Sequence, residues 1–598
     1  MNSKQRAWGQ FATPVDVADL LLGFCLRRPD DLLLDPGCGD GALLRRAAHW
    51  RAWLASGRPP PPTLYGVELD PTAAASAADV PGAVIEQANF FTLNPDDYPR
   101  FDAIVGNPPY TRAEWIDRLD VGNQPSLFPA NESPAEPPAT TPLLPRELGK
   151  TLSGRAGLYA FFLLHSLGFL REGGRLGFVV PNGWLDVAYG EGLKRFILDH
   201  FRVVAVVESA VERWFAAARV NTCLIILERT DEQAARRANR VRFVRLRQPL
   251  AELLGRDTDS RRIAAVEQLV TRLLPALDRQ TAGAATRVIA QGELGAAERW
   301  GTYLRAPEFF LHPSSRPVAP LGEWADVQRG YTTGANDFFI LDPQRVEEWG
   351  IEPKYRRPLL KSLRGIHAHR VSRSDCRHEL LLIPPGEQLA DTAAAGYLEW
   401  GAQRGIPERP TCAMRRPWYA LPEQEPGAVF LAKGVWQRHF APVAVEPIAV
   451  DQQLYRIIPL GQAIEAGVTP QIVAALLNST WFALACELGG RVNFGEGVLW
   501  LASYEIDRIL LPDPRALAAG ERRELAAAFG RLAMLPVADT VEMLLSEERR
   551  ALDELVFDLI GLSTSERAAA REVLVECLTG RRRRAKKPRH EEKQPDVD

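Results

Sequence analysis

The sequence lacks several features that would assign it quickly to a class. Its seven cysteines are scattered and contain no CxxC pair, so neither a disulfide framework nor a zinc site is expected. No segment reaches the roughly 18 consecutive apolar residues of a membrane helix, and the N-terminus carries no apolar signal core. The sequence therefore predicts a cytoplasmic protein with no metal site and no membrane partner.

An excess of charge of one sign is also missing. Lys and Arg total 72 against 75 Asp and Glu, which gives a formal net charge of −3. This near balance provides no global attraction to a polyanion, so any surface for nucleic acid has to be local. The 598 residues, 46% of them hydrophobic, suffice for three or four domains.

The N-terminal part has an α/β pattern. Short β-rich runs alternate with amphipathic stretches over residues 15–227, which is typical of βα units that build a mostly parallel sheet. Strands are expected at residues 31–35, 64–68, 83–86, 101–106, 175–180, 203–207 and 222–227, and helices at residues 15–28, 42–53 and 158–170.

One segment interrupts this pattern. Residues 121–145 contain seven prolines and few large apolar side chains, so they cannot form a packed element. We expect a mobile loop over residues 121–156. It is either a tolerated surface insertion or a lid that orders over substrate, and the sequence leaves both interpretations open.

Changes in composition divide the chain. The pattern predicts an α/β domain at residues 1–245, a helical linker at 246–299 and an irregular α+β domain at 300–515. A helical region at 516–580 and a charged, disordered tail at 581–598 follow.

The first chemically informative segment is LLLDPGCGDG, residues 32–41. An apolar strand ends at Asp35 and runs into three glycines before a helix, which brings backbone close to a ligand at the carboxyl end of a strand. The G-x-G-x-G spacing differs from the dinucleotide fingerprint, and the loop lacks the Lys-Ser/Thr of a P-loop. A purely structural tight turn is the alternative.

Two further segments follow at strand ends. In YGVELD, Glu68 ends a strand and can accept hydrogen bonds from a ribose diol, although a surface carboxylate is the plainer interpretation. In NPPY, two prolines fix the backbone, so the Asn107 side-chain oxygen and the Pro108 carbonyl can accept both hydrogens of a reacting amine. Tyr110 is then directed outward, and a proline-stiffened turn is the alternative.

DPGCGDG, GVELD and NPPY, in this order and spacing, resemble the motifs of amino-methyltransferases that use S-adenosylmethionine. With GQFATP upstream (residues 9–14), the order resembles the gamma class of adenine-specific (N6) DNA methyltransferases of restriction-modification systems. Residues 327–339 and 476–501 are more weakly similar to target-recognition segments of such enzymes. The resemblance implies a class I, Rossmann-like methyltransferase sheet, a C-terminal α+β target-recognition domain and a helical C-terminal region.

The resemblance also assigns residues. Phe215 matches an aromatic that packs on the target base, although a phenylalanine is usually core. Asn89 stands where the family usually has Asp. The implied S-adenosylmethionine contacts are Thr13, Asp35, Gly37, Gly39, Glu68, Asn89, Phe90 and Asn107, and the implied catalytic residues are Asn107, Pro108, Tyr110 and Phe215.

The implied function is transfer of the methyl group of S-adenosylmethionine to N6 of an adenine flipped out of double-stranded DNA. The protein would be the modification component of a restriction-modification or phage-defence system. No convincing PD-(D/E)xK arrangement is present, so a nuclease would be a separate chain. The alternatives are methylation of protein glutamine, RNA or cytosine amino groups, and a cofactor-bound DNA-binding subunit with little catalysis.

DNA contacts require cations and aromatics in the second half of the chain. His367 and His369 suggest a metal, but no Cys or His cluster completes a site. The basic tail could add non-specific DNA affinity or be idle. The candidates for DNA contact are Arg356, Arg357, Lys361, Arg364, Arg370, Arg415, Arg416, Trp418, Tyr419, Lys433, Trp436 and Arg438.

Overall fold

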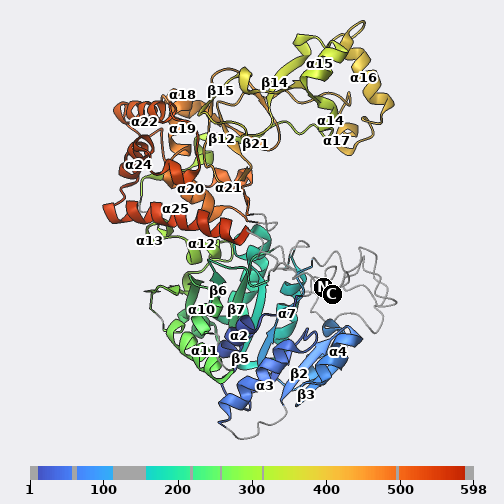
Figure 1. Cartoon of the computed structure of the whole chain (residues 1–598), viewed down its shortest axis with the longest axis vertical. Coiled ribbons are helices and arrows are strands. Elements are labelled where there is room, and N and C mark those ends of the chain that lie inside the picture. Colours follow the sequence, from blue (N-terminus) through green and yellow to red (C-terminus); the bar gives the residue numbers. More distant parts are fainter. Residues whose placement is uncertain are drawn as a thin grey trace, which may run out of the picture. The chain divides into compact units, whose positions relative to one another are not determined.

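The computed structural model describes residues 11–56, 63–111, 152, 156–215, 220–255, 259–275, 277–312, 316–384, 386–492 and 497–585. The chain forms two compact units (Figure 1). Unit 1 comprises Met1–Arg305, Asn493–Glu496 and Gly580–Asp598, and unit 2 comprises Ala306–Val492 and Gly497–Thr579. Of the loop expected at residues 121–156, all but Leu152 and Ala156 lies outside the described residues.

Unit 1 is built on a ten-stranded sheet in the order β3-β2-β1-β4-β5-β7-β6-β8-β10-β9. Every strand expected between residues 31 and 227 is present. Strands β1 to β6 and β8 run parallel, whereas β7 is antiparallel to both of its neighbours. The bounds are β1 (Leu33–Asp35), β2 (Leu64–Glu68), β3 (Ala83–Gln87), β4 (Phe101–Gly106), β5 (Leu170–Pro181), β6 (Phe201–Ser209), β7 (Thr222–Arg229), β8 (Arg240–Leu246), β9 (Arg279–Gln280) and β10 (Ala284–Ala290).

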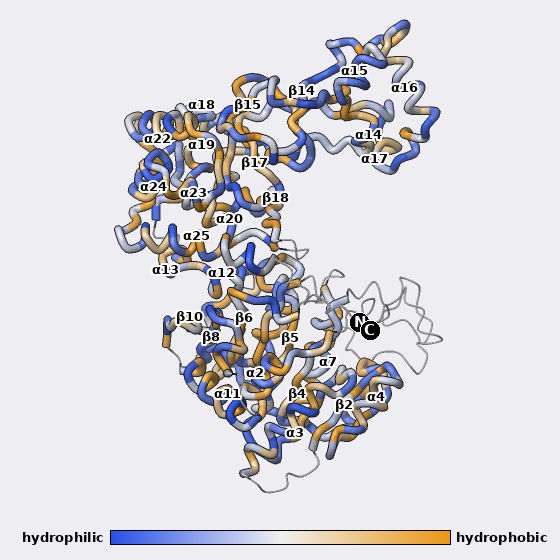
Figure 2. The backbone as a smooth tube through the Cα atoms, viewed as in Figure 1, coloured by the Kyte–Doolittle hydropathy of each residue, from blue (hydrophilic) through white to orange (hydrophobic). Residues whose placement is uncertain are grey.

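Helices cover both faces of this sheet. Leu33 lies in a core shared with α2 and α3, while its neighbour Leu34 lies in a core shared with α7 and α8, because successive residues of a strand point to opposite faces. Burial on both faces explains why the central strands are continuous apolar runs, which Figure 2 shows in orange. The helices are α2 (Val15–Cys25), α3 (Ala42–Leu54), α4 (Pro71–Ala78), α7 (Leu158–Phe169), α8 (Glu191–His200), α9 (Gln233–Ala238), α10 (Leu250–Leu254), α11 (Asp259–Leu273) and α12 (Trp300–Arg305).

The segment at residues 246–299 differs from the helical linker expected there. It contains α10 and α11, but it also supplies β9 and β10, and β10 pairs antiparallel with β8 from Ala284↔Leu246 to Ala290↔Arg240. The segment therefore extends the sheet of unit 1. The sequence of β10, AATRVIA, has no long apolar run, in keeping with the half-exposure of most of its side chains.

Unit 2 contains a five-stranded sheet, β12-β21-β17-β19-β15, and a four-stranded sheet, β13-β16-β14-β20. Two strand pairs, β11-β23 and β18-β22, lie apart from them. The strands are β11 (Val318–Pro320), β12 (Ala325–Arg329), β13 (Ile340–Leu341), β14 (Arg356–Leu360), β15 (Arg370–Val371), β16 (His378–Leu381), β17 (Val429–Ala432), β18 (Gly434–Val435), β19 (Val443–Ala444), β20 (Ala449–Val450), β21 (Leu454–Pro459), β22 (Leu499–Trp500) and β23 (Leu510–Pro512).

The region expected to be helical, residues 516–580, lies in unit 2 up to Thr579. The α+β residues and this helical region share one buried core, in which Trp481 and Phe557 both lie. The last helix continues to Ala585, so the first residues of the expected disordered tail are helical, and residues 586–598 lie outside the described residues. The helices are α13 (Glu308–Leu311), α14 (Asn336–Phe339), α15 (Pro343–Trp349), α16 (Ala393–Gln403), α17 (Pro410–Ala413), α18 (Gly461–Glu465), α19 (Pro470–Leu477), α20 (Thr480–Gly489), α21 (Ser503–Asp507), α22 (Ala519–Leu532), α23 (Thr540–Met543), α24 (Glu547–Ile560) and α25 (Thr564–Ala585).

Within the described ranges, no single helix is long and apolar enough to cross a membrane. The bent pair α19 and α20, with 59° between the two helices, meets the criteria of length and composition only when taken together. Both helices are buried in the core of unit 2.

Candidate active site

The sequence motifs meet at one edge of the sheet of unit 1. Strands β1, β2 and β4 are parallel neighbours, with β1 in the middle. Asp35 and Glu68 end β1 and β2, and Asn107 directly follows β4. The carboxyl ends of these three strands therefore lie side by side, at the edge where open α/β sheets bind ligands.

The glycine loop is fixed by the neighbouring strand. The backbone N–H of Cys38 donates to the carbonyl of Val67 at 3.0 Å, and Gly41 donates to Cys38 at 2.9 Å. Gly39 adopts a φ of +54°, and a Cβ added to it would meet no atom within 4 Å. The loop therefore presents open space beside Gly39, just before α3 begins.

Asp35 is buried below this loop, with 2% of its surface exposed. Its Oδ1 accepts a hydrogen bond from the backbone N–H of Gly37 at 3.3 Å. Burial raises the pKa of Asp35 to about 7, and the nearby charge of Glu68 acts in the same direction. Its carboxyl group retains further hydrogen-bonding capacity next to the glycine loop.

Glu68 is also buried, at 4% exposure, so it is not a surface carboxylate. Its Oε2 accepts from the backbone N–H of Gly39 and its Oε1 from that of Asp70, both at 2.9 Å. Glu68 therefore holds the glycine loop, a role that the sequence did not indicate. Each carboxylate oxygen can accept a second hydrogen bond, so this contact is compatible with a bound diol.

Asn89 and Phe90 follow β3. The Oδ1 atom of Asn89 accepts from the backbone N–H of Phe91 at 3.1 Å and caps a short 3₁₀ turn. Phe90 is 3% exposed and packs on Phe162 with ring centroids 5.5 Å apart, and on His165 at 4.8 Å. The Phe90 side chain thus belongs to the core that supports the edge.

The side-chain amide of Asn107 is held in one orientation. Its Nδ2 donates to the backbone carbonyl of Phe11 at 2.8 Å. Its Oδ1 is buried and accepts no hydrogen bond from any described residue. A buried amide oxygen without a donor costs free energy, so this atom requires an external N–H group or water to satisfy it. Pro108, which follows, is buried, and its carbonyl belongs to the same fixed turn.

Three aromatic rings lie next to this amide. The Tyr110 centroid is 5.7 Å from that of Phe11 and 6.0 Å from that of Phe215. Phe11 and Phe215 are 6.4 Å apart. The Tyr110 hydroxyl is buried without a described partner, and burial raises its pKa well above the usual value.

Phe11 was not among the residues selected from the sequence. It stands two positions before Thr13 in the GQFATP segment, and an aromatic next to this motif was the available signal. Thr13 is half-buried at the start of α2. The structure thus brings Phe11, Asn107, Tyr110 and Phe215 together, and groups Asp35, Gly37, Gly39 and Glu68 at the neighbouring strand ends.

Comparison with known proteins identifies similarity to methyltransferases. Residues 64–215 match the family model described as Eco57I restriction-modification methylase, and residues 312–545 match that of the C-terminal domain of Type II methyltransferase M.Eco57I. The chain is 24% identical to Type II methyltransferase M.XamI of Xanthomonas campestris pv. amaranthicola over 80% of each protein. The chain is similar to restriction-modification methyltransferases.

Other methyltransferases are matched over shorter lengths. Type II methyltransferase M.AccI of Acinetobacter calcoaceticus is 20% identical over 56% of this chain and 55% of its own length. M.TthHB8I of Thermus thermophilus is 31% identical over 30% of this chain and 36% of its own length. The chain therefore covers less than two thirds of each of these two relatives.

The fold of the chain is also similar to that of a restriction-modification enzyme of known structure. The Type IIL restriction-modification enzyme MmeI, solved in complex with DNA, superposes with a TM-score of 0.56 at 12% identity. The match covers 95% of this chain and 75% of MmeI. The class I methyltransferase sheet expected from the sequence is confirmed.

The second family model, over residues 312–545, falls mainly on unit 2. In this unit, several of the cations that were candidates for DNA contact bind carboxylate or carbonyl oxygens of the protein. Arg356 pairs with Glu379 at 2.7 Å. Arg415 donates to the carbonyls of Thr332 and Thr333 at 2.7 and 2.8 Å. Arg438 donates to three carbonyls of residues 363–366 at 2.6 to 2.8 Å. Arg356 therefore links β14 to β16, and Arg415 and Arg438 hold loops of unit 2 in place.

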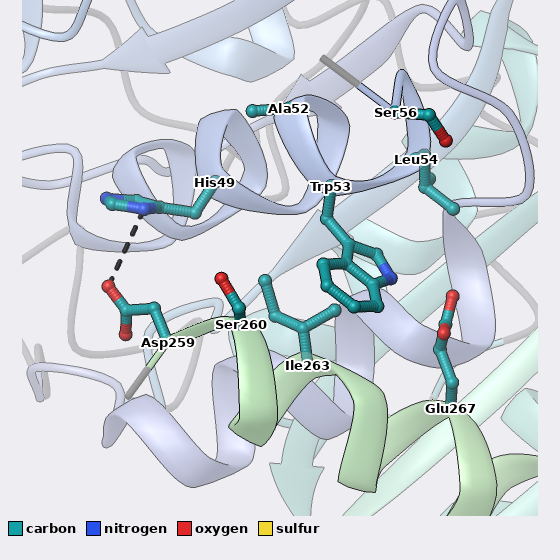
Figure 3. A pocket seen from close by; sticks show the side chains of 9 residues that line it. All are labelled: His49, Ala52, Trp53, Leu54, Ser56, Asp259, Ser260, Ile263 and Glu267. Carbon is teal, nitrogen blue, oxygen red and sulfur yellow. Dashed lines mark ion pairs between the residues drawn. The ribbon is translucent and has the colours of Figure 1, made fainter. Parts of the chain in front are cut away.

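A separate hollow of about 600 Å³ lies between α3 and α11 (Figure 3). Trp53 points from α3 toward α11, and His49 Nδ1 lies 3.6 Å from Asp259 Oδ2. Its lining comes from α11 and from the second half of α3 with the residues that follow it, whereas the glycine loop precedes α3. None of the motif residues lines this hollow.

Proposed function

We propose that the protein is an S-adenosylmethionine-dependent DNA methyltransferase that methylates N6 of adenine at a specific site. The observation that carries the proposal is the buried, unsatisfied Oδ1 of Asn107, whose Nδ2 donates to the Phe11 carbonyl, together with the Phe11, Tyr110 and Phe215 ring cluster. An exocyclic amine offers two N–H donors and a flat ring, which match a fixed acceptor next to aromatic faces.

The chemistry expected of these residues is positioning. Asn107 Oδ1 and the Pro108 carbonyl accept the two amine hydrogens, which turns the nitrogen lone pair toward the incoming methyl group. The target base has to leave the duplex at a cost of a few kcal/mol. Tyr110 and Phe215 replace part of the lost stacking. The buried Tyr110 hydroxyl retains its proton, so we assign no base function to it.

The residues of the glycine loop fit S-adenosylmethionine, which supplies an activated methyl group when bound. Open space beside Gly39 admits a ligand close to the backbone, and the Asp35 and Glu68 carboxyl groups have acceptor capacity left. Thr13, Gly37 and Asn89 complete the proposed contacts. Phe90 contributes through the core that carries Asn89, since its ring is 3% exposed.

DNA is the proposed substrate because the type II methyltransferases share similarity with this chain over both units. Unit 2 then supplies target recognition. We propose that the protein is the modification component of a restriction-modification or phage-defence system, with any endonuclease on a separate chain. Protein glutamine or RNA as substrate is the second candidate, because NPPY also suits other amine-containing substrates.

The test is transfer of a radiolabelled methyl group from S-adenosylmethionine to unmethylated genomic DNA, followed by nucleoside analysis. Label is expected in N6-methyladenine and is expected to disappear in Asn107→Ala. Asn94→Ala is the matched control, because Asn94 caps a 3₁₀ turn away from the motif edge and its loss should leave transfer intact. Label in N4-methylcytosine, protein or RNA would replace the substrate assignment. Cofactor binding without label anywhere would indicate a DNA-binding subunit.

A further inference from the structure

Three cations gather around one strand pair of unit 2. Lys433 lies between β17 and β18, Arg329 ends β12, and Arg491 forms a bridge with Trp500 of β22. The pKa values of Lys433 and Tyr455 are affected by the nearby arginine charges. Burial and the charges of Arg329 and Arg491 lower the pKa of Lys433. The same two arginines also act on the Tyr455 hydroxyl.

The backbone holds all three positions firmly. The N–H of Lys433 donates to Gln453 at 2.9 Å, and its carbonyl accepts from Leu501 at 3.1 Å. Arg491 and Trp500 exchange two backbone hydrogen bonds of 2.9 and 2.8 Å. Arg329 pairs with Tyr455 in the β12–β21 ladder. The cations are therefore fixed at their Cα atoms, so binding a ligand orders only their side chains.

Among the described residues, one ion pair joins a carboxylate to this cluster. Glu505 pairs with Arg491, with Nε and Oε1 3.2 Å apart. Across the described parts of unit 2, neither Lys433 nor Arg329 forms an ion pair with a carboxylate. Arg329 is exposed, while Lys433 and Arg491 are half-buried. Like charges held close together repel each other, and an external anion would relieve this repulsion.

These cations differ from the other candidates of unit 2. The guanidinium groups of Arg356, Arg415 and Arg438 are already bonded to carboxylate or carbonyl oxygens of the protein. The pKa of Lys433 is affected only by burial and by the two arginine charges, and Arg329, which contacts the Tyr455 hydroxyl, binds no carboxylate of the described residues. Trp436, one residue beyond β18, is 40% exposed and adds an aromatic surface next to the same strand pair.

We propose that Lys433 and Arg329, with Arg491 beside them, form a binding site for the phosphate backbone of duplex DNA. The site deepens the proposed function, on which it rests, because it assigns the backbone contact of unit 2 to the strand pair β18–β22. Phosphates of a duplex present closely spaced negative charges along an edge, and lysine and arginine neutralise them without reading sequence. The contact positions the duplex, and specificity comes from other residues.

The test is binding of fluorescein-labelled duplex DNA by the full-length protein, measured by anisotropy at increasing KCl concentration without cofactor. We expect Lys433→Gln and Arg329→Gln each to lower the slope of log K against log salt by about 0.9, and the double variant by about 1.8. The weakening should be equal for methylatable and unrelated sequences. Arg491 is not changed, because it pairs with the buried Glu505 and its loss would also affect stability.

Arg523→Gln together with Arg531→Gln is the matched control. Both arginines are exposed on α22 of unit 2, so the charge change equals that of the double variant. An unchanged slope in the Lys433 and Arg329 variants, or an equal loss in the control, would overturn the inference while the proposed function stands. If the wild-type protein shows no salt-dependent binding to duplex DNA, the inference and the proposed DNA substrate both fail. Melting temperatures equal to wild type show that the variants are folded.

Discussion

The stability of unit 1 should depend on pH through the buried carboxyl group of Asp35. Burial raises its pKa from the usual 3.8 to about 7, so the folded chain keeps a proton that the unfolded chain releases. The stability from this proton is fully present below about pH 4 and is lost as the pH rises through about 7, an effect on the order of 4 kcal/mol. We expect the wild-type protein to lose stability from about pH 5 to 8 and Asp35→Asn to lose much less. Denaturant unfolding at both pH values measures this, and equal losses would contradict it.

The effects of the Phe11 ring and of its backbone carbonyl can be measured separately. Phe11→Ala removes an aromatic neighbour of Tyr110 but keeps the backbone oxygen that receives Asn107 Nδ2. Loss of one aromatic contact to a base costs about 1 to 3 kcal/mol. We therefore expect methyl transfer about 10- to 100-fold slower, with cofactor affinity unchanged, whereas Asn107→Ala abolishes transfer. Single-turnover rates and calorimetric binding distinguish the two effects. Equal rates for Phe11→Ala and wild type would exclude the ring from the site.

At the scale of elements, two glycines of one loop should respond differently to alanine. A Cβ at Gly39 meets open space, whereas one at Gly41, with φ +83°, would lie 3.0 Å from Ala77 Cα. Gly39→Ala should cost only about 1 kcal/mol of backbone strain but fill the space proposed for the cofactor. Gly41→Ala should destabilise unit 1 by more. Unfolding and calorimetry with S-adenosylmethionine check this. Unimpaired cofactor binding by Gly39→Ala would remove the loop from the proposed contacts.

Arg305, the last residue of α12, links β6 to the 3₁₀ turn that follows β5. It lies between Asp186, at 2.8 Å, and Glu208 at the end of β6, at 2.9 Å. Removing one partner of a buried ionic cluster costs roughly 3 to 5 kcal/mol. We expect Arg305→Ala to lose this amount in chemical unfolding. Arg195→Ala breaks an exposed pair with Glu191 and should lose less than about 1 kcal/mol. A loss of similar size in both variants would be inconsistent with the buried cluster.

The sequence predicted those elements that local pattern determines. Apolar runs ending in Asp35, Glu68 and Asn107 located the strands and the edge, because buried parallel strands are continuous apolar segments. Strands β8 and β10 were missed, since arginines alternate with apolar residues in β8 and most side chains of β10 are half-exposed. The orientation of the Asn107 amide depends on Phe11, 96 residues away, and no local pattern encodes such a contact. The same holds for Arg415 and Arg438, whose partners are backbone carbonyls of distant loops.

At the scale of the whole molecule, unit 2 combines the α+β region and the helical region. The sequence pattern predicted a boundary between these two regions at residues 515 and 516. Asp553 of α24 is fully buried and accepts from the backbone N–H and the hydroxyl of Thr480, both at 2.6 Å. It also pairs with the buried Arg549 at 3.2 Å. The helical region thus shares one core with the α+β region instead of forming a separate core.

This arrangement predicts the result of breaking the contact. Asp553→Ala strands the Arg549 charge and should destabilise unit 2 by roughly 3 to 5 kcal/mol. Hydrogen exchange should then accelerate in β12, β17 and β21 as well as in α24, because one core unfolds as one unit. Exchange in β4 and β5 of unit 1 should not change. Asp558→Ala, which removes a carboxylate that is 62% exposed, is the control on the same helix. Faster exchange confined to α22, α24 and α25 would instead mean that residues 306–515 fold on their own.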